Sequence, residues 1–130
     1  DYSMSKILLV EDDQFLSSLL KNRLVREQFE VVTAEDGPKA LETLKTVRPD
    51  LILLDIILPG KSGFEVFESI KADPRFQGKN ALPVIVISNL GQESDLERSR
   101  ELGAADYFVK ARSSIDEIVK RVREVLATKQ

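Results

Sequence analysis

The acidic residue Asp55 closes the apolar run Leu51-Ile-Leu-Leu-Asp55, and its carboxylate is a candidate nucleophile. The breaks Pro49-Asp50 and Pro59-Gly60 mark this run as a strand covered on both faces. An ionised carboxylate is too costly to bury without partners, so other segments must supply them. A carboxylate oxygen held in this way can attack phosphorus and form an acyl phosphate. The residue type and its position therefore indicate phosphoryl-transfer chemistry.

Polar residues also end three other apolar runs, and they are the expected partners of Asp55. They are Glu11, Asp12, Ser88 and Lys110. Together with Asp55 they gather three carboxylates and one ammonium, so the group is net negative and its like charges repel. A divalent cation would balance this charge, and an all-oxygen ligand set favours Mg²⁺ or Mn²⁺ over zinc. The cation, the Lys110 ammonium and the Ser88 hydroxyl would then stabilise an incoming phosphoryl group.

Each of these residues also has an ordinary explanation when it is taken alone. A single Asp after a strand is usually a turn residue, and the run Glu11-Asp12-Asp13 resembles the acids that complement a helix dipole. Ser88 alone would be a helix cap, and Lys110 alone a solvated charge. The joint pattern at one predicted edge favours a site. Asp13 is left outside it, as an exposed acid at the start of a helix.

The elements that must position these residues alternate between strands and helices. Apolar runs predict five strands, at residues 6–10, 30–34, 51–55, 83–87 and 105–109. Periodicity and capping signals predict helices at about 13–28, after 36, after 62, at about 92–102 and after 114. Such alternation implies right-handed crossovers and a doubly wound parallel α/β sheet with helices on both faces. In the order 2-1-3-4-5, the first and third strands lie about 4.8 Å apart, so Asp12 and Asp55 can share one cation.

The predicted helices differ in their apolar content. The last helix has the cleanest apolar stripe, made of Ile115, Ile118, Val119, Val122, Val125 and Leu126. The helix at 92–102 is mostly charged and has few apolar anchors, mainly Leu96 and Leu102, so we expect it to shift at low cost. The first helix is expected to turn inward Phe15, Leu16, Leu19, Leu20 and Leu24. Residues 73–82 are predicted as a longer loop, and Phe64 as a packing residue.

The composition describes one ordinary domain and excludes several functions. The chain has 130 residues and a net charge of −3, which suits one domain, taken as residues 4–128, without direct nucleic-acid binding. It has no cysteine and no histidine, so disulfides, thiolate chemistry and histidine-based sites are excluded. We expect a cytoplasmic protein without a membrane span, because no apolar run approaches roughly 20 residues and no signal peptide is visible. Residues 1–3 precede Met4 and are interpreted as a remnant of cloning.

These residues stand in motifs that resemble the receiver domain of bacterial two-component response regulators, the CheY-like family. The motifs are Leu9-Val10-Glu11-Asp12, Leu54-Asp55 with Leu58-Pro59 and Gly63, Ile87-Ser88, and Gly103-Ala104 leading to Tyr107-Phe108-Val109-Lys110. The resemblance covers about residues 6–126. It implies the flavodoxin-like fold with the strand order given above. It also implies a signalling module that is phosphorylated, and no enzymatic activity other than its own phosphorylation and slow autodephosphorylation.

The resemblance also implies roles for individual residues. Asp55 would be the phosphoacceptor, Ser88 and Lys110 would sense the phosphoryl group, Tyr107 would change rotamer, and Mg²⁺ would be held by Glu11, Asp12, Asp55 and the backbone carbonyl of Ile57. The phosphoryl group would come from a sensor histidine kinase or a phosphotransfer protein. Phosphorylation would change the surface formed by the fourth helix, the fifth strand and the fifth helix. An unknown target or output domain would recognise that surface, and a homodimer through it is left open.

Several positions depart from the pattern of the family. Ala111 follows Lys110 where the family usually has Pro, often after a cis bond, which would cost about 3 kcal/mol before Ala. Asn89 replaces a small residue, and Ser62 replaces an Asp that often caps the helix. The changes at Ala111 and Asn89 leave open a pseudo-receiver, which keeps the fold and acts as an interaction module without phosphorylation. Ile57 and Leu90 are apolar and cannot orient water, so slow autodephosphorylation is expected.

Two other classes of function fit the residues less well. An aspartyl-nucleophile phosphatase needs a general acid two residues after the nucleophile, where this chain has Ile57. A flavodoxin-like cofactor binder needs donors for a phosphate after the first strand, and the acids Glu11-Asp12-Asp13 would repel it.

Overall fold

The computed structural model describes residues 4–89 and 92–128. Within these residues the strands are β1 (Lys6–Val10), β2 (Glu30–Ala34), β3 (Leu51–Asp55), β4 (Val84–Ser88) and β5 (Asp106–Val109). The α-helices are α1 (Gln14–Arg26), α2 (Gly37–Thr43), α3 (Gly63–Ala72), α4 (Glu93–Glu101) and α5 (Ile115–Thr128). Three short 3₁₀ turns, at Pro74–Phe76, Gly78–Asn80 and Lys110–Arg112, complete the elements of this part of the chain. None of the helices described is long and apolar enough to cross a membrane.

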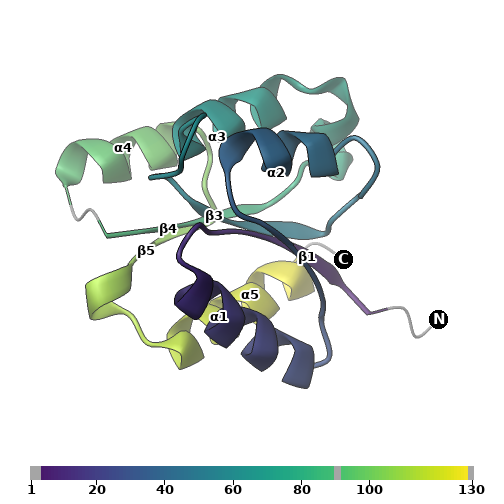
Figure 1. Ribbon diagram of the computed structural model, residues 1–130. Coiled ribbons are helices and arrows are strands. Elements are labelled where there is room, and N and C mark those ends of the chain that lie inside the picture. The colour runs from purple at the N-terminus through teal and green to yellow at the C-terminus, as the bar shows by residue number, and fades with distance from the viewer. Residues whose placement is uncertain (1–3, 90–91, 129–130) are drawn as a thin grey trace.

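The five strands form one parallel sheet in the order β2-β1-β3-β4-β5, which confirms the predicted topology. Helices α1 and α5 cover one face, and α2, α3 and α4 cover the other (Figure 1). Every residue of β3 and β4 is buried, which explains their unbroken apolar sequences. Successive residues of a strand face opposite sides, so Leu8 joins the core under α2 and α3 while Ile7 and Leu9 join the core under α1 and α5.

Helix α1 begins after Asp13, which is an exposed acid at the start of the helix, as predicted. The Asp13 carboxylate accepts hydrogen bonds from the backbone N–H groups of Phe15 and Leu16, at 3.0 and 3.2 Å. Asp13 is therefore the N-cap of α1 rather than an acid within its first turn.

The inner face of α1 is narrower than the apolar pattern predicts. Leu20 and Leu24 are fully buried, whereas Phe15 is 75% exposed and Leu19 is 40% exposed. The prediction that Phe15 and Leu19 turn inward is wrong, because the helix directs Ser17, Leu20 and Leu24 to the sheet. Residues at 15 and 19 lie on a neighbouring stripe of the helix, which faces solvent.

Helices α3 and α5 both begin with the predicted capping box. Ser62 and Glu65 exchange two hydrogen bonds of 3.2 Å, and Ser114 and Glu117 exchange two of 3.1 Å. Each pair satisfies two backbone donors that the start of a helix leaves free. Helix α4 lacks such a cap, because the side chain of its N-cap residue Gln92 makes no capping hydrogen bond.

The crossover from α3 to β4 is fixed by Arg75. Its guanidinium donates to both carboxylate oxygens of Asp73 and to the carbonyl oxygen of Leu44, the residue that caps the C-terminus of α2. It also lies over the ring of Phe76, 5.0 Å from the centroid. These contacts lower the pKa of Asp73 below its ordinary value, mainly through its side-chain hydrogen bonds to Arg75. The predicted longer loop is thus an ordered connection with two 3₁₀ turns.

Candidate functional site

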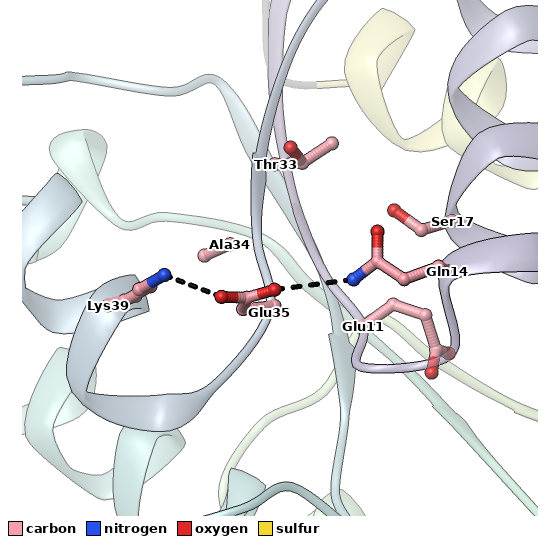
Figure 2. Close-up of a pocket in the computed structure, with 7 residues that line it drawn as sticks. All are labelled: Glu11, Gln14, Ser17, Thr33, Ala34, Glu35 and Lys39. Carbon is pink, nitrogen blue, oxygen red and sulfur yellow. Dashed lines mark hydrogen bonds and ion pairs between the residues drawn. The ribbon is translucent and has the colours of Figure 1, made fainter.

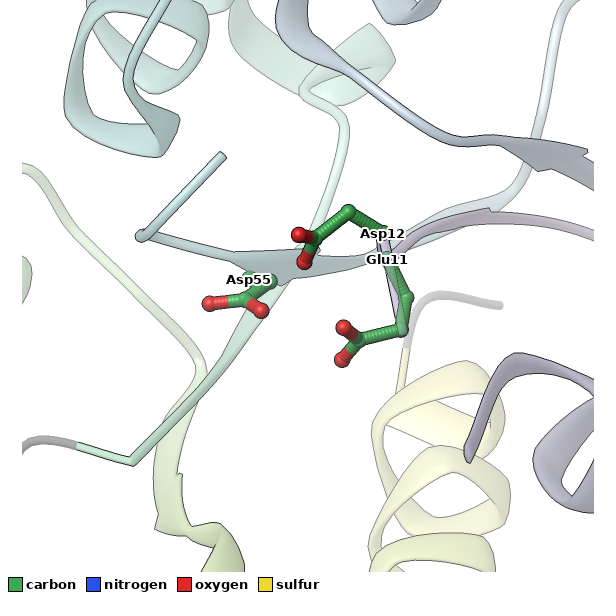
Figure 3. Close-up of side chains that lie close together, drawn as sticks. All are labelled: Glu11, Asp12 and Asp55. Carbon is green, nitrogen blue, oxygen red and sulfur yellow. The ribbon is translucent and has the colours of Figure 1, made fainter. Parts of the chain in front are cut away.

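Three carboxylates meet at the carboxyl edge of the sheet. One oxygen from each of Glu11, Asp12 and Asp55 lies within 4.8 Å of the others, and Figure 3 shows the three side chains converging from β1 and β3. Glu11 and Asp55 are buried, and Asp12 is exposed. Since β1 and β3 are hydrogen-bonded neighbours, the strand order alone brings the acids together. The predicted convergence of these acids is therefore observed, while their chemical roles stay predictions.

Backbone contacts fix the orientation of the buried carboxylates. The Ile57 N–H donates to Asp55 Oδ1 at 2.9 Å, and the Asp13 N–H donates to Glu11 Oε2 at 3.0 Å. Gly63, the first residue of α3, packs directly on Asp55: a Cβ at this position would lie 2.3 Å from the Asp55 carbonyl oxygen. Only glycine permits this approach, so the start of α3 and the end of β3 form one rigid corner.

Lys110 reaches both buried acids. Its Nζ atom lies 2.8 Å from Asp55 Oδ2, to which it donates a hydrogen bond, and forms an ion pair of 2.7 Å with Glu11 Oε1. The 3₁₀ turn Lys110–Arg112 places the lysine here, and the described residues contain no cis peptide bond. The substitution of Ala111 for proline therefore does not keep Lys110 from Asp55.

The pKa values of Glu11 and Lys110 reflect this arrangement. Burial raises the pKa of Glu11 from 4.5 to about 7, and the nearby charge of Asp55 adds to the rise, although Lys110 and the Asp13 N–H oppose it. Burial alone would lower the pKa of Lys110, but its contacts with Asp55 and Glu11 outweigh burial, and the pKa is raised. The lysine is therefore held as a cation beside the candidate nucleophile.

Ser88 and Tyr107 lie on the two strands beyond β3. Ser88 is fully buried at the end of β4, where the preceding residue Ile87 pairs with Asp55. The hydroxyls of Ser88 and Tyr107 share a hydrogen bond. Burial raises the pKa of Tyr107 above its ordinary value, and the charges of Asp95 and Asp55 raise it further, against the effect of Ser88. The Ser88–Tyr107 bond was not predicted, since only the register of β4 and β5 brings the two side chains together.

The remaining predicted positions lie at the rim of the site. Ile57 is 49% exposed and turns its side chain to solvent, and Asn89 is also exposed. Leu90 lies outside the described residues. Phe64 is buried, as predicted, in the core beneath α3.

A polar cavity of about 260 Å³ lies beside this site, between α1, β2 and α2. Figure 2 shows Glu35 between Lys39 and Gln14, and its carboxylate lies 2.5 Å from Lys39 Nζ and 3.4 Å from the amide nitrogen of Gln14. The Glu11 carboxylate points away from this cavity and toward Lys110. Glu11 belongs both to the lining of this cavity and to the three acids, so the cavity adjoins the site on the side of β2.

The donor set at the edge of the sheet fits a hard divalent cation. Carboxylate oxygens from two neighbouring strands converge, and one of them, on Asp12, is open to solvent, so a cation could keep bound water. The cluster contains the three acids to which the resemblance to receiver domains assigns Mg²⁺. Opposite the acids, the Lys110 ammonium marks a second position where negative oxygens would be stabilised.

Comparisons with known proteins agree with this geometry. The family model described as "Response regulator receiver domain" matches residues 7–123. The chain is 40% identical over 123 residues to the transcriptional regulatory protein CpxR of Escherichia coli K12, covering 95% of this chain and 50% of that protein. It is 37% identical over 121 residues to the alkaline phosphatase synthesis transcriptional regulatory protein PhoP of Bacillus subtilis, covering 93% and 48%. The chain thus spans about half the length of the curated relatives it matches.

A solved receiver domain in its activated form has the same fold. The BeF3-activated N-terminal receiver domain of RstA from Klebsiella pneumoniae superposes with a TM-score of 0.82 at 31% identity, covering 94% of this chain and 98% of that one.

Proposed function

The chain belongs to the response regulator receiver domain family, and from this premise we propose that Asp55 accepts a phosphoryl group from a histidine kinase or phosphotransfer protein. An Asp55 carboxylate oxygen attacks phosphorus, the phosphorus–nitrogen bond of the donor phosphohistidine breaks, and the histidine nitrogen leaves with the electron pair. The observation that supports this proposal most directly is Lys110 Nζ at 2.8 Å from the carboxylate of Asp55. That ammonium stabilises negative oxygens on the transferred group.

Glu11, Asp12, Asp55 and the Ile57 carbonyl are the proposed ligands of Mg²⁺, with Mn²⁺ as a substitute. When bound, the cation supplies positive charge to the phosphoryl oxygens. The chain itself orients the nucleophile through the Ile57 N–H and keeps it among buried groups. The Ser88 hydroxyl, one strand away, donates a hydrogen bond to a phosphoryl oxygen.

The surface around Asp55 suggests where a donor protein binds. Phe15 and Leu19 lie one turn apart on α1, and both are exposed, as is Ile57 beyond β3. Exposed apolar side chains of this kind fit a protein partner. We propose that the surface formed by α4, β5 and α5 binds an output domain, a separate target protein or a second copy of the chain.

Mass spectrometry with acetyl phosphate tests the phosphoacceptor. Incubation with acetyl phosphate and Mg²⁺ should add the mass of one phosphoryl group, and chelation of the metal should prevent it. Asp55→Asn should abolish the gain, whereas Asp116→Asn, at an exposed position of α5, should leave it unchanged. A gain that persists in Asp55→Asn would refute the assignment, and no gain in the parent would restore the pseudo-receiver interpretation, which no contact in the site favours.

The lifetime of the phosphorylated form should be long. Ile57 is apolar and cannot orient an attacking water, so hydrolysis of the acyl phosphate is slow. Ile57→Glu should shorten the lifetime several-fold in a decay measured after removal of the donor, and Ile57→Leu should not. Equal decay of the glutamate variant and the parent would contradict this expectation.

A further inference from the structure

The loop between β3 and α3, residues 56–62, packs against the start of α2. A Cβ built on Gly37, the first residue of α2, would lie 2.2 Å from the carbonyl oxygen of Lys61 and 2.8 Å from its Cβ. The two backbones therefore approach more closely than any residue with a side chain at position 37 would permit. Gly37 is buried and its φ is not positive, so the close approach, and not the backbone conformation, requires glycine here.

A second contact lies beside the first. Gly60 has a φ of +77°, and a Cβ at this position would lie 3.3 Å from Pro38 Cδ, so the proline ring packs against the turn. The first turn of α2 is itself capped, because the Asp36 carboxylate accepts a hydrogen bond of 2.7 Å from the Lys39 N–H. The start of α2 thus supports two consecutive residues of the loop, Gly60 and Lys61.

The supported loop carries the proposed backbone ligand of Mg²⁺ near its beginning. Ile57 offers its carbonyl, since its N–H donates to Asp55 Oδ1 at 2.9 Å and its side chain is half exposed. The next residue, Leu58, packs against the core, and the Gly63 N–H closes the loop by donating to the Ile56 carbonyl at 3.0 Å. Between these anchors, the loop contacts the start of α2.

We propose that Gly37 and Pro38 are positioning residues, which hold this loop so that the Ile57 carbonyl reaches a cation bound by the three acids. The inference rests on the proposed function, because it takes the Ile57 carbonyl as a ligand. Neither residue belongs to the cluster of acids, so both act through the loop. Mg²⁺ requires nearly ideal octahedral geometry at about 2.0–2.1 Å, so a small displacement of the loop weakens the site.

Gly37→Ala tests the contact directly, because the added methyl group must displace Lys61. Titration calorimetry of this variant should record an affinity for Mg²⁺ about ten-fold lower than that of the parent, the lower end of what the loss of an outer-shell partner costs. Pro38→Ala removes the ring without adding a clash and should lower the affinity less. Circular dichroism establishes that each variant is folded at the temperature of the titration.

Gly78→Ala is the matched control. Its φ of +59° is strained for alanine, but no atom lies within 4 Å of the new Cβ, and the position belongs to the crossover before β4. This variant should lose stability and keep the parent's affinity for Mg²⁺. A loss of affinity equal to that of Gly37→Ala would show that general destabilisation is responsible, and it would overturn the inference.

The dependence of phosphorylation on Mg²⁺ gives a second readout. With acetyl phosphate as the donor, Gly37→Ala should need more Mg²⁺ for its half-maximal rate and should approach the parent's rate at saturation, because Asp55 and Lys110 are not displaced. A lower rate at saturation with an unchanged requirement for Mg²⁺ would place the effect of Gly37 on the nucleophile, and the role of the loop would be wrong.

The possible failures are distinct. Parent-like affinity for Mg²⁺ in folded Gly37→Ala overturns the role of the loop contact and leaves Asp55 as phosphoacceptor. If Gly37→Ala does not fold, Pro38→Ala decides, and parent-like affinity in that variant overturns the inference. Absence of Mg²⁺ binding by the parent overturns the proposed metal site, and the inference falls with it.

Discussion

Helices α4 and α5 lie on opposite faces of the sheet (Figure 1), yet they are held in very different ways. Helix α5 buries five apolar side chains and starts with a capping box, whereas the only buried residue of α4 is Ser99 and its N-cap residue makes no side-chain bond. Burial of apolar side chains contributes most of the free energy that fixes a helix on a sheet. One helix is therefore part of the core, and the other can move at small cost.

What holds α4 is largely polar. The Arg98 guanidinium lies over the Phe64 ring, 4.3 Å from its centroid, and forms an ion pair of 3.5 Å with Glu68. Both partners belong to α3, which begins on the rigid corner at Asp55. A cation over an aromatic ring at a partly exposed site contributes about 0.5–1 kcal/mol, and an exposed ion pair adds little. Such a link can hold α4 and still yield to a new contact.

The largest difference between the helices should appear on truncation of their apolar residues. Ile118→Ala on α5 should lower the free energy of unfolding by about 3 kcal/mol, because the residue is buried in the core and leaves a cavity. Leu96→Ala on α4 should cost less than about 1 kcal/mol, since Leu96 is only partly buried. Urea denaturation of the two variants measures both values, and equal losses would mean that α4 is as firmly fixed as α5.

The free energy of unfolding should also depend on pH, through Glu11. Its pKa in the folded protein is about 7, above the ordinary value of 4.5, so its contribution to stability is complete below about pH 4.5 and is lost as the pH rises through 7. The loss is on the order of 2–3 kcal/mol in metal-free protein. Denaturation curves between pH 4.5 and 8 measure it, and Glu11→Gln should remove most of this dependence.

The affinity for Mg²⁺ should depend on pH through the same carboxylate. A metal ligand must be ionised, so the affinity for Mg²⁺ should rise with pH and level off above about 7. Titration calorimetry at several pH values records the rise, and a constant affinity from pH 5.5 to 8 would show that Glu11 is ionised throughout.

The smallest effect should come from the link between α4 and α3. Arg98→Ala should speed hydrogen exchange in α4 by about two- to five-fold, which corresponds to the loss of 0.5–1 kcal/mol, and leave α5 unchanged. Arg100→Ala, at an exposed position two residues along the helix, is the matched control. Faster exchange in α5 as well would indicate general destabilisation rather than a local link.

The sequence predicted the fold because each apolar run and each cap has a local physical cause. The strand order then accounts for the meeting of Glu11, Asp12 and Asp55, since their positions follow from topology rather than from side-chain detail. The burial of Phe15 could not be predicted correctly, because an apolar stripe on a helix can be wider than the surface it covers.

The contacts of single side chains could not be predicted from the sequence either. The contact between Ser88 and Tyr107 depends on the register of β4 against β5, and the ion pair of Arg98 with Glu68 depends on how α4 packs beside α3. Neither has a signal in residue spacing, because both arise where elements distant in sequence pack together.

The hydrogen bonds of Arg75 with Asp73 and Leu44 have a practical consequence. They anchor the crossover before β4, at the end of the sheet opposite Asp55. The crossover has open space beside it, since a Cβ at Gly78 would meet no atom within 4 Å. The chain contains no cysteine, so a single thiol introduced at the exposed neighbour Asn80 could carry one fluorophore. A dye at that end would let the binding of a partner protein be followed by fluorescence anisotropy while the reacting surface stays bare.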